Sequence, residues 1–377
     1  MNVLLIPDTF KESLSAAEVA SAMRQGILEV DPKAHIFHIP ASDGGEGFLD
    51  SVKYYVDSLV ERKLETVDPL GRPIISIYLY SEAEKTAYIE LAKASGLELL
   101  TISERDPLKT STLGTGIQIR DAIQKGATTI YVGIGGSATN DAGMGIAGAL
   151  GFQFLDAEGK ILSANGANLA MIHSIIKSKI NLSNITFFAI NDVLNPLFGN
   201  EGAAYTYAKQ KGATPEGIMK LDRGLQHFSQ VVKKELNCDF AKLAGSGAAG
   251  GTAFGLKSFL DAEYVSGVSF MLKLARFREM IDSENIDIIL TGEGCIDKQT
   301  ASGKLVSGVA TEAHAMNIPV VAISGMLKLN SEEVKSLGLT RVTQLYHPDQ
   351  APGYSFEHAS ELIQQRTREL LKGLDLQ

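Results

Sequence analysis

Gly133-Ile134-Gly135-Gly136-Ser137-Ala138-Thr139-Asn140-Asp141 is the stretch that joins a β-branched run at 128–134 to a helix-compatible run at 140–150. A strand, a glycine turn and a helix start together bind anions, because glycine lets a ligand approach the main chain and the first helical N–H groups are unpaired. The helix dipole adds roughly half a positive charge there. The stretch predicts an α/β fold with a site for a phosphorylated ligand. A tight turn that needs glycine only for its backbone shape is the alternative.

Acidic residues follow four other apolar runs. They are Asp8 after 3–6, Asp43 and Glu46 after 35–39, Asp192 after 185–190, and Glu293 and Asp297 after 286–290. The carboxyl ends of parallel strands share one edge of a sheet, so these acids are expected to converge. Carboxylates beside a bound phosphate imply a divalent cation, because the negative groups would otherwise repel one another. Any single aspartate could instead cap a helix or form a turn.

Composition narrows the class of protein. The 377 residues are 45% hydrophobic and 21% charged, as in an ordinary globular protein that is long enough for two domains. The net charge is −9 and no block of lysine or arginine occurs, which argues against nucleic acid or a membrane surface as a partner. The chain opens into a strand at 2–6 and has no apolar stretch of about 18 residues, so a cytoplasmic location is expected. Cys238 and Cys295 lack the spacing of a disulfide framework or a zinc site.

The order of patterns predicts two regions of alternating strand and helix, separated by antiparallel strands. The first ~60 residues read as strand, helix, strand, with a capping box at Ser15 and Glu18. Between residues 64 and 100, a turn at 68–73 separates strand-like runs. A long amphipathic helix is expected at 215–236. The last ~95 residues return to alternation, with expected strands at 286–290, 319–323 and 342–346 and expected helices at 305–316 and 355–371.

A dinucleotide-binding enzyme is a competing interpretation. Gly133 to Ala138 follows a strand, and Asp156 lies near the spacing of a ribose-binding acid, so an NAD-dependent oxidoreductase remains open. That interpretation gives no role to the acidic residues that follow the four other apolar runs. The run 245–250 matches GxGxxG but follows no convincing strand, which favours a ligand-facing loop or a close-packed helix start. No Walker A motif is present, because Lys304 is followed by Leu305.

An ordered set of motifs across nearly the whole chain resembles the bacterial type I glycerate kinases. The motifs are Pro7-Asp8-Thr9-Phe10-Lys11-Glu12-Ser13-Leu14-Ser15-Ala16, Ser42-Asp43-Gly44-Gly45-Glu46-Gly47, Gly135-Gly136-Ser137-Ala138-Thr139-Asn140-Asp141, Asn191-Asp192-Val193-Leu194-Asn195-Pro196-Leu197, Gln210-Lys211-Gly212-Ala213, Gly247-Ala248-Ala249-Gly250-Gly251 and Thr291-Gly292-Glu293-Gly294. Two positions depart from the family's pattern. Cys295 stands where these enzymes more often carry arginine, and Lys209 stands where relatives can have proline.

The resemblance implies an α/β fold with a Rossmann-like parallel-sheet domain built from both chain ends, and a second inserted α/β domain containing antiparallel strands. We place these domains at 1–62 plus 285–377 and at 63–284, with the active site in the cleft. The implied reaction is ATP-dependent phosphorylation of D-glycerate, most often at the 2-hydroxyl. Formation of 3-phosphoglycerate is the nearest alternative. A hydroxy-acid dehydrogenase and a non-catalytic sugar-acid sensor are more distant ones, and the sequence does not indicate an oligomeric state.

Phosphoryl transfer requires alignment and charge neutralisation more than covalent chemistry, so each role has candidates. The expected roles are phosphate binding by Gly135, Gly136, Ser137 and Asn140, Mg²⁺ binding by Glu293 and Asp297, and charge neutralisation by Lys11 and Lys304. Either lysine could equally be a solvated residue in a first helical turn. Asp192 is the expected base for the substrate hydroxyl, with Asp8 as its rival, and Asp43 and Glu46 are expected to line the cleft.

Overall fold

Two sheets organise the chain, each in a unit of its own. The computed structural model describes residues 1–377 except 11–12, 41–46, 298–299, 301–304, 352 and 374–377. Residues 1–43 and 268–377 form one unit, here called the terminal unit, and residues 44–267 form the central unit. The boundaries expected from the sequence, after residues 62 and 284, lie later in the chain. Part of the reason is that α2 (Phe48–Tyr55) packs on a strand of the central unit.

The terminal unit is built around a parallel sheet of five strands. In spatial order they are β13 (Arg341–Gln344), β12 (Val320–Leu327), β11 (Ile288–Ile296), β1 (Asn2–Pro7) and β2 (His35–His38). Every neighbouring pair is parallel. Along this unit the order is 2-1-3-4-5, one of the two common doubly wound orders, and it reverses between β1 and β11. The expected Rossmann-like sheet from both chain ends is therefore confirmed.

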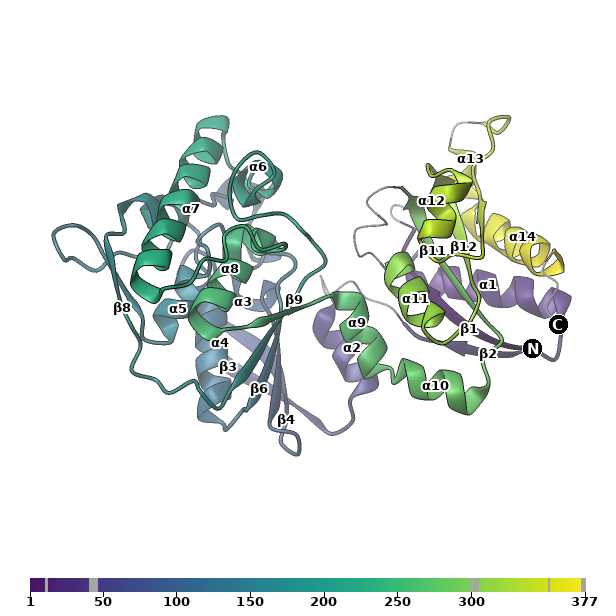
Figure 1. Ribbon diagram of the computed structural model, residues 1–377, viewed down its shortest axis with the longest axis horizontal. Coiled ribbons are helices and arrows are strands. Elements are labelled where there is room, and N and C mark those ends of the chain that lie inside the picture. The colour runs from purple at the N-terminus through teal and green to yellow at the C-terminus, as the bar shows by residue number, and fades with distance from the viewer. Residues whose placement is uncertain (11–12, 41–46, 298–299, 301–304, 352, 374–377) are drawn as a thin grey trace. The chain divides into compact units, whose positions relative to one another are not determined.

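Helices cover both faces of this sheet (Figure 1). α1 (Ala16–Val30) and α14 (Ala359–Lys372) pack against the face that carries Val3 and Leu5, and α11 (Leu305–His314) covers the opposite face. The other helices of the unit are α9 (Gly267–Leu274), α10 (Phe277–Glu284), α12 (Ser331–Ser336) and α13 (Tyr354–Glu357). α1 starts at the expected capping box, in which the Ser15 hydroxyl accepts from the Glu18 N–H and the Glu18 carboxylate accepts from the Ser15 N–H.

The central unit has a mixed sheet of six strands. In spatial order they are β10 (Glu263–Val265), β9 (Thr186–Ile190), β6 (Thr129–Gly133), β5 (Thr86–Glu90), β4 (Pro73–Ser81) and β3 (Leu59–Val67). β3, β4 and β5 are antiparallel neighbours, whereas β5, β6, β9 and β10 are parallel. The antiparallel strands predicted between residues 64 and 100 are thus confirmed. Their turn is held by Asp68, whose carboxylate accepts from the N–H groups of Leu70 and Arg72.

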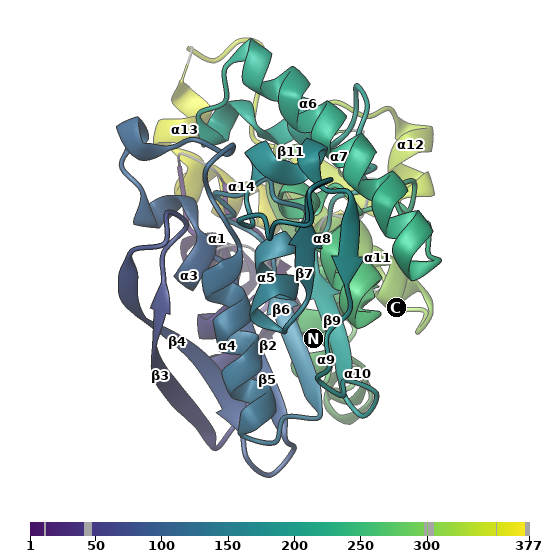
Figure 2. The ribbon, with the colours of Figure 1, turned by 90° about the vertical axis from the view of Figure 1, so that its left-hand side faces the viewer.

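The main core of the central unit lies on one face of this sheet. α4 (Leu113–Gln124), α5 (Met144–Ala149), α7 (Pro215–Leu236) and α8 (Ala248–Leu260) contribute to it, and Figure 2 shows α4, α5 and α8 over the strands. The remaining elements are α3 (Ala92–Ser95), α6 (Ala203–Tyr207), the short 3-10 helices at Leu97–Leu99, Ile102–Glu104, Gly166–Met171 and Lys209–Lys211, and the pair β7 (Gln153–Leu155) and β8 (Ser174–Ile176). α2 covers the opposite face, where the buried ring of Phe48 lies against Gly133.

Candidate active site

Three parallel strands of the central unit, β5, β6 and β9, end at the same level of the sheet. A candidate residue lies at or just after the end of each one. Glu90 at the end of β5 is opposite Gly133 of β6, and Gly133 is opposite Ile190 of β9. The glycine-rich loop that follows Gly133 and the segment that begins at Asn191 therefore leave the sheet at the same edge. This edge is where ligands bind in parallel α/β sheets.

The loop after β6 does not have the geometry predicted from its sequence. The helix expected from residue 140 begins at Met144, so the residues between Ile134 and Met144 form an irregular connection. The first amides of that helix are occupied: the Asp141 carboxylate accepts from the N–H groups of Gly143 (3.2 Å) and Gly145 (3.1 Å). A free helix N-terminus that could hold a phosphate was therefore a wrong expectation, because the chain supplies its own anion there.

Asp141 is buried completely and serves the fold. Besides the two glycine amides, its carboxylate accepts from the Thr112 N–H and the Thr112 hydroxyl, both at 2.8 Å. Burial raises the pKa of Asp141, and the four hydrogen bonds oppose that shift. Asp141 thus ties the loop to the start of α4 rather than facing a ligand.

Exposure divides the four predicted phosphate-binding residues into two pairs. Gly135 and Gly136 are half-exposed, whereas Ser137 and Asn140 are buried. The Ser137 hydroxyl accepts from the Thr139 N–H (3.0 Å), so it already has a partner inside the loop. Neither amide atom of Asn140 has a hydrogen-bond partner among the described residues. The accessible main chain of this loop is therefore at the two glycines.

A second glycine-rich segment packs on this loop. Ala249, Gly250 and Gly251 all have left-handed backbone conformations at the start of α8. A Cβ atom at Gly250 would lie 2.1 Å from the carbonyl oxygen of Thr139, so only glycine allows the two segments to approach this closely. The run 245–250 is a close-packed helix start, one of the two alternatives expected for it. No strand leads into it, so the dinucleotide-binding interpretation of its GxGxxG pattern has no support.

The side chain of Lys211 also contacts the loop after β6. Its side chain is 2% exposed, and its Nζ donates to the carbonyl oxygen of Thr139 (2.7 Å) and contacts the Ser137 hydroxyl at 3.4 Å. Burial lowers the pKa of Lys211 to about 7, and the charge of Asp141 opposes that shift. The sequence predicts no role of its own for this lysine, although it lies in one of the quoted motifs.

Asp192 and Glu90 flank the loop at the same sheet edge. Asp192 follows β9 as predicted, and its Oδ1 accepts from the Gly267 N–H (2.9 Å), which fixes one side of the carboxylate. Glu90 is buried at the end of β5 and accepts from the Leu49 N–H at the start of α2 (3.1 Å). Burial raises the pKa of Glu90, and both Leu49 and Lys93 oppose the shift. Glu90 could have been found from the sequence, because it follows a short apolar run at 87–89 much as the other acids follow theirs.

In the terminal unit, Asp8 and Glu293 lie beside the point where the strand order reverses. Asp8 follows β1, its N–H donates to the carbonyl oxygen of Gly292 (2.8 Å), and its carboxylate accepts from the Thr9 N–H (2.6 Å). Glu293, 6% exposed, is not in a turn after a strand, as was wrongly expected. β11 runs on to Ile296 because β12 pairs with it as far as Leu327.

A buried threonine connects the two predicted metal ligands. The Thr300 hydroxyl donates to Oε1 of Glu293 (2.5 Å) and accepts from the Asp297 N–H (3.1 Å). Asp297 follows the end of β11, and the Cys295 thiol lies 3.9 Å from its Oδ2. Glu293 and Asp297 therefore belong to one small network. Of the remaining predicted site residues, Lys11, Asp43, Glu46 and Lys304 lie outside the described residues.

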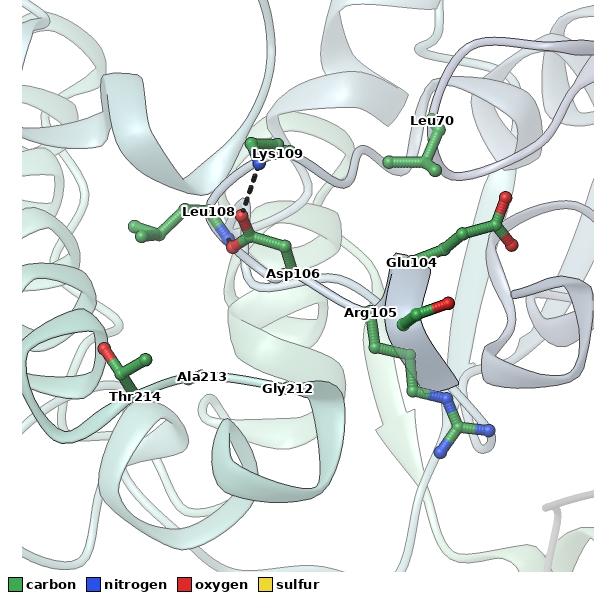
Figure 3. A pocket seen from close by; sticks show the side chains of 10 residues that line it. Leu70, Glu104, Arg105, Asp106, Leu108, Lys109, Gly212, Ala213 and Thr214 are labelled. Atoms are coloured by element: carbon green, nitrogen blue, oxygen red, sulfur yellow. Dashed lines mark hydrogen bonds and ion pairs between the residues drawn. The ribbon is translucent and has the colours of Figure 1, made fainter. Parts of the chain in front are cut away.

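A cavity of about 440 Å³ lies in the central unit next to the turn that carries Lys211 (Figure 3). It is lined by Leu70, Ser103, Glu104, Arg105, Asp106, Leu108, Lys109, Gly212, Ala213 and Thr214. The Arg105 guanidinium points away from the ion pair between Lys109 and Asp106. None of the predicted site residues that the structure describes lines this cavity. Gly212, which borders this cavity, follows Lys211 directly. A Cβ atom at Gly212 would lie 2.0 Å from the Arg105 carbonyl oxygen, so the turn after Lys211 requires glycine.

The family model of the Glycerate kinase family matches residues 3–375. The chain belongs to the glycerate kinase family. It is 40% identical to a glycerate kinase of Halalkalibacterium halodurans over 98% of this chain and 97% of the relative. It is also 40% identical to the glycerate 2-kinase of Escherichia coli K12 over 87% of this chain and 86% of that protein. A crystal structure of a glycerate kinase 2 from Salmonella typhimurium LT2 matches with a TM-score of 0.77 and 37% identity, covering 99% of this chain and 97% of that one.

Membership of the glycerate kinase family makes the chain a phosphotransferase, as the resemblance implied. It also removes the dehydrogenase and the sensor as main interpretations. Among the helices that the structure describes, none is long and apolar enough to cross a membrane.

Proposed function

We propose that this glycerate kinase transfers the γ-phosphoryl group of ATP to the 2-hydroxyl of D-glycerate and releases 2-phosphoglycerate. The observation that carries the proposal is the match to the glycerate kinase family over 3–375, together with 40% identity to a relative named glycerate 2-kinase. Kinase activity implies ATP as the phosphoryl donor. The two free cysteines, Cys238 and Cys295, agree with a cytoplasmic location, which is part of the proposal.

Asp192 is the proposed base. In this role it orients the substrate hydroxyl and accepts its proton while the phosphoryl group is transferred. Support comes from its place at the carboxyl end of β9, and from the Gly267 N–H that holds one oxygen of the carboxylate. Asp8, at the end of β1 in the terminal unit, is the rival for the same role.

The glycine-rich loop is proposed to contact the transferred phosphoryl group through its main chain. Gly135 and Gly136 are the accessible part of the loop, and they carry no side chain that would keep a phosphate away. Ser137 and Asn140, buried behind them, are proposed to hold the loop in shape. Lys11 and Lys304 remain proposed for charge neutralisation, and Asp43 and Glu46 for the substrate-lining surface.

Glu293 and Asp297 are proposed to hold Mg²⁺. A kinase site commonly binds Mg²⁺ through one or two carboxylates and the phosphates of the nucleotide, so this pair of oxygen donors fits. No group of three or more His, Cys, Asp or Glu suited to a metal occurs in the part of the chain that the structure describes, as expected if the nucleotide completes the shell. When bound, Mg²⁺ would neutralise charge on the phosphate oxygens. Glu293→Gln and Asp297→Asn should each raise the Mg²⁺ concentration needed for half-maximal rate, and an unchanged Mg²⁺ dependence would argue against this assignment.

The position of phosphorylation can be tested on the product itself. ³¹P NMR of a reaction with D-glycerate, ATP and Mg²⁺ distinguishes the two phosphoglycerates, because phosphorus couples to one proton in a 2-phosphate and to two in a 3-phosphate. We expect the signal of 2-phosphoglycerate at early times. A first product with the 3-phosphate coupling pattern would overturn the 2-hydroxyl assignment and leave the glycerate kinase reaction standing.

A further inference from the structure

Lys211 carries a buried amine without a matching anion at contact distance. Its Nζ donates to a carbonyl and lies near a hydroxyl, both in the Ser137–Thr139 segment, and it forms no ion pair with a carboxylate among the described residues. A buried ammonium group is costly unless an opposite charge compensates it. Most buried lysines avoid this cost by pairing, so the arrangement needs an explanation.

The surroundings of Lys211 supply only part of that compensation. Asp141 is the charged group that acts on it, and its carboxylate is already held by Thr112, Gly143 and Gly145. Ser137 and Thr139, which contact the amine directly, are neutral. Across the turn, the Arg105 carbonyl packs on Gly212.

We propose that Lys211 is a positioning residue that becomes protonated when an anionic group of the substrate binds at Gly135 and Gly136. The inference rests on the proposed function, since it takes that loop to be where an anion binds. The anion is a carboxylate or a phosphate, as carried by D-glycerate or ATP. Lys211 acts through the loop: its amine contacts the Thr139 carbonyl and the Ser137 hydroxyl, and Ser137 directly follows the two half-buried glycines.

Proton balance makes the proposal measurable. In the free protein the Lys211 pKa of about 7 leaves the amine mostly neutral at pH 8. An anion bound near the buried Nζ favours the ammonium form, so a proton from the buffer is added to Nζ. Binding at pH 8 is then accompanied by proton uptake approaching one per site. At pH 6 the amine is already mostly protonated, and the uptake is close to zero.

Isothermal titration calorimetry in two buffers of different ionisation enthalpy measures this proton number directly. One arm titrates D-glycerate alone, and the second titrates a non-hydrolysable ATP analogue with Mg²⁺. We expect uptake at pH 8 in the arm whose anion sits at the loop, and its loss in Lys211→Met. Lys209→Met is the matched control, because Lys209 is exposed two residues away and should leave the uptake intact.

Each outcome decides the inference. Binding heats without proton uptake at pH 8 in either arm would overturn it, and so would uptake that persists in Lys211→Met. If the methionine variant does not fold, as checked by circular dichroism, Lys211→Gln replaces it. A protein that turns over D-glycerate and ATP without this uptake keeps its proposed function and loses only the role of Lys211.

Discussion

At the scale of single residues, an acid at a strand end can serve either the fold or the chemistry, and its partners tell which. The Asp141 carboxylate accepts from three N–H groups and one hydroxyl of its own unit, whereas Asp192 follows the end of β9 and its Oδ1 accepts from the Gly267 N–H. The sequence shows both acids in the same way. The roles differ because Thr112, distant in sequence, folds against Asp141.

Asp192→Asn tests the proposed base. The amide keeps an oxygen for the Gly267 N–H, so the local structure should persist, but it cannot accept a proton. We expect kcat to fall by about 10²–10⁴-fold, with the KM for ATP changed by less than about threefold. Steady-state kinetics measure both. Asp8→Asn is the matched control, and a loss confined to that variant would transfer the role to Asp8.

Lys211 predicts an unusual dependence of stability on pH. Because its folded pKa, about 7, is below the value of 10.5 for a free lysine, the unfolded chain binds one more proton between these limits. The free energy of unfolding gained from this group therefore rises with pH from 7 to 10.5, by at most roughly 4–5 kcal/mol. Urea unfolding at pH 6.5 and pH 9 should show this rise in the wild type and a smaller one in Lys211→Met. Equal slopes for the two proteins would contradict the depressed pKa.

At the scale of elements, pattern alone located the long helix α7 and missed the irregular connection before α5. α7 has the bounds expected from its apolar periodicity, Pro215–Leu236, because the pattern is long and its Thr214 cap is local. The connection before α5 could not be predicted, since it depends on Asp141 and on the segment around Gly250. The full length of β11 likewise depends on its pairing with β12.

Two glycine substitutions test the close packing of the loop. Gly250→Ala should lower the free energy of unfolding by about 3 kcal/mol or more, because its left-handed backbone disfavours a side chain and the new Cβ would meet the Thr139 carbonyl. Gly148→Ala in α5 is the control, because nothing lies within 4 Å of its Cβ position. It should be neutral or stabilising by up to about 1 kcal/mol. Thermal or urea unfolding distinguishes the two, and equal effects would refute the packing argument.

At the scale of the whole molecule, the family resemblance implied two α/β domains, one of them built from both chain ends. The boundary between the two units could not be placed in this way. α2 follows β1 and β2 in the chain, but it packs on β5 of the central unit. No element is predicted from the sequence at residues 48–55, and a helical pattern does not show which sheet a helix covers.

The central unit is a continuous segment with its own core, which suggests a test with fragments. Residues 44–267 expressed alone should unfold cooperatively, whereas residues 63–284 should be markedly less stable. The 63–284 fragment lacks Phe48, which is buried against Gly133. It also lacks the Leu49 N–H, which donates a hydrogen bond to the Glu90 carboxylate. Thermal melts followed by circular dichroism compare the two fragments. A 63–284 fragment as stable as 44–267 would favour the later boundary.

The central claim is that the protein is an ATP-dependent D-glycerate kinase, and the most direct measurement is ADP release coupled to NADH oxidation through pyruvate kinase and lactate dehydrogenase. The account predicts a rate that saturates with D-glycerate and falls to background when either D-glycerate or ATP is omitted. A rate that is the same with and without D-glycerate would contradict it.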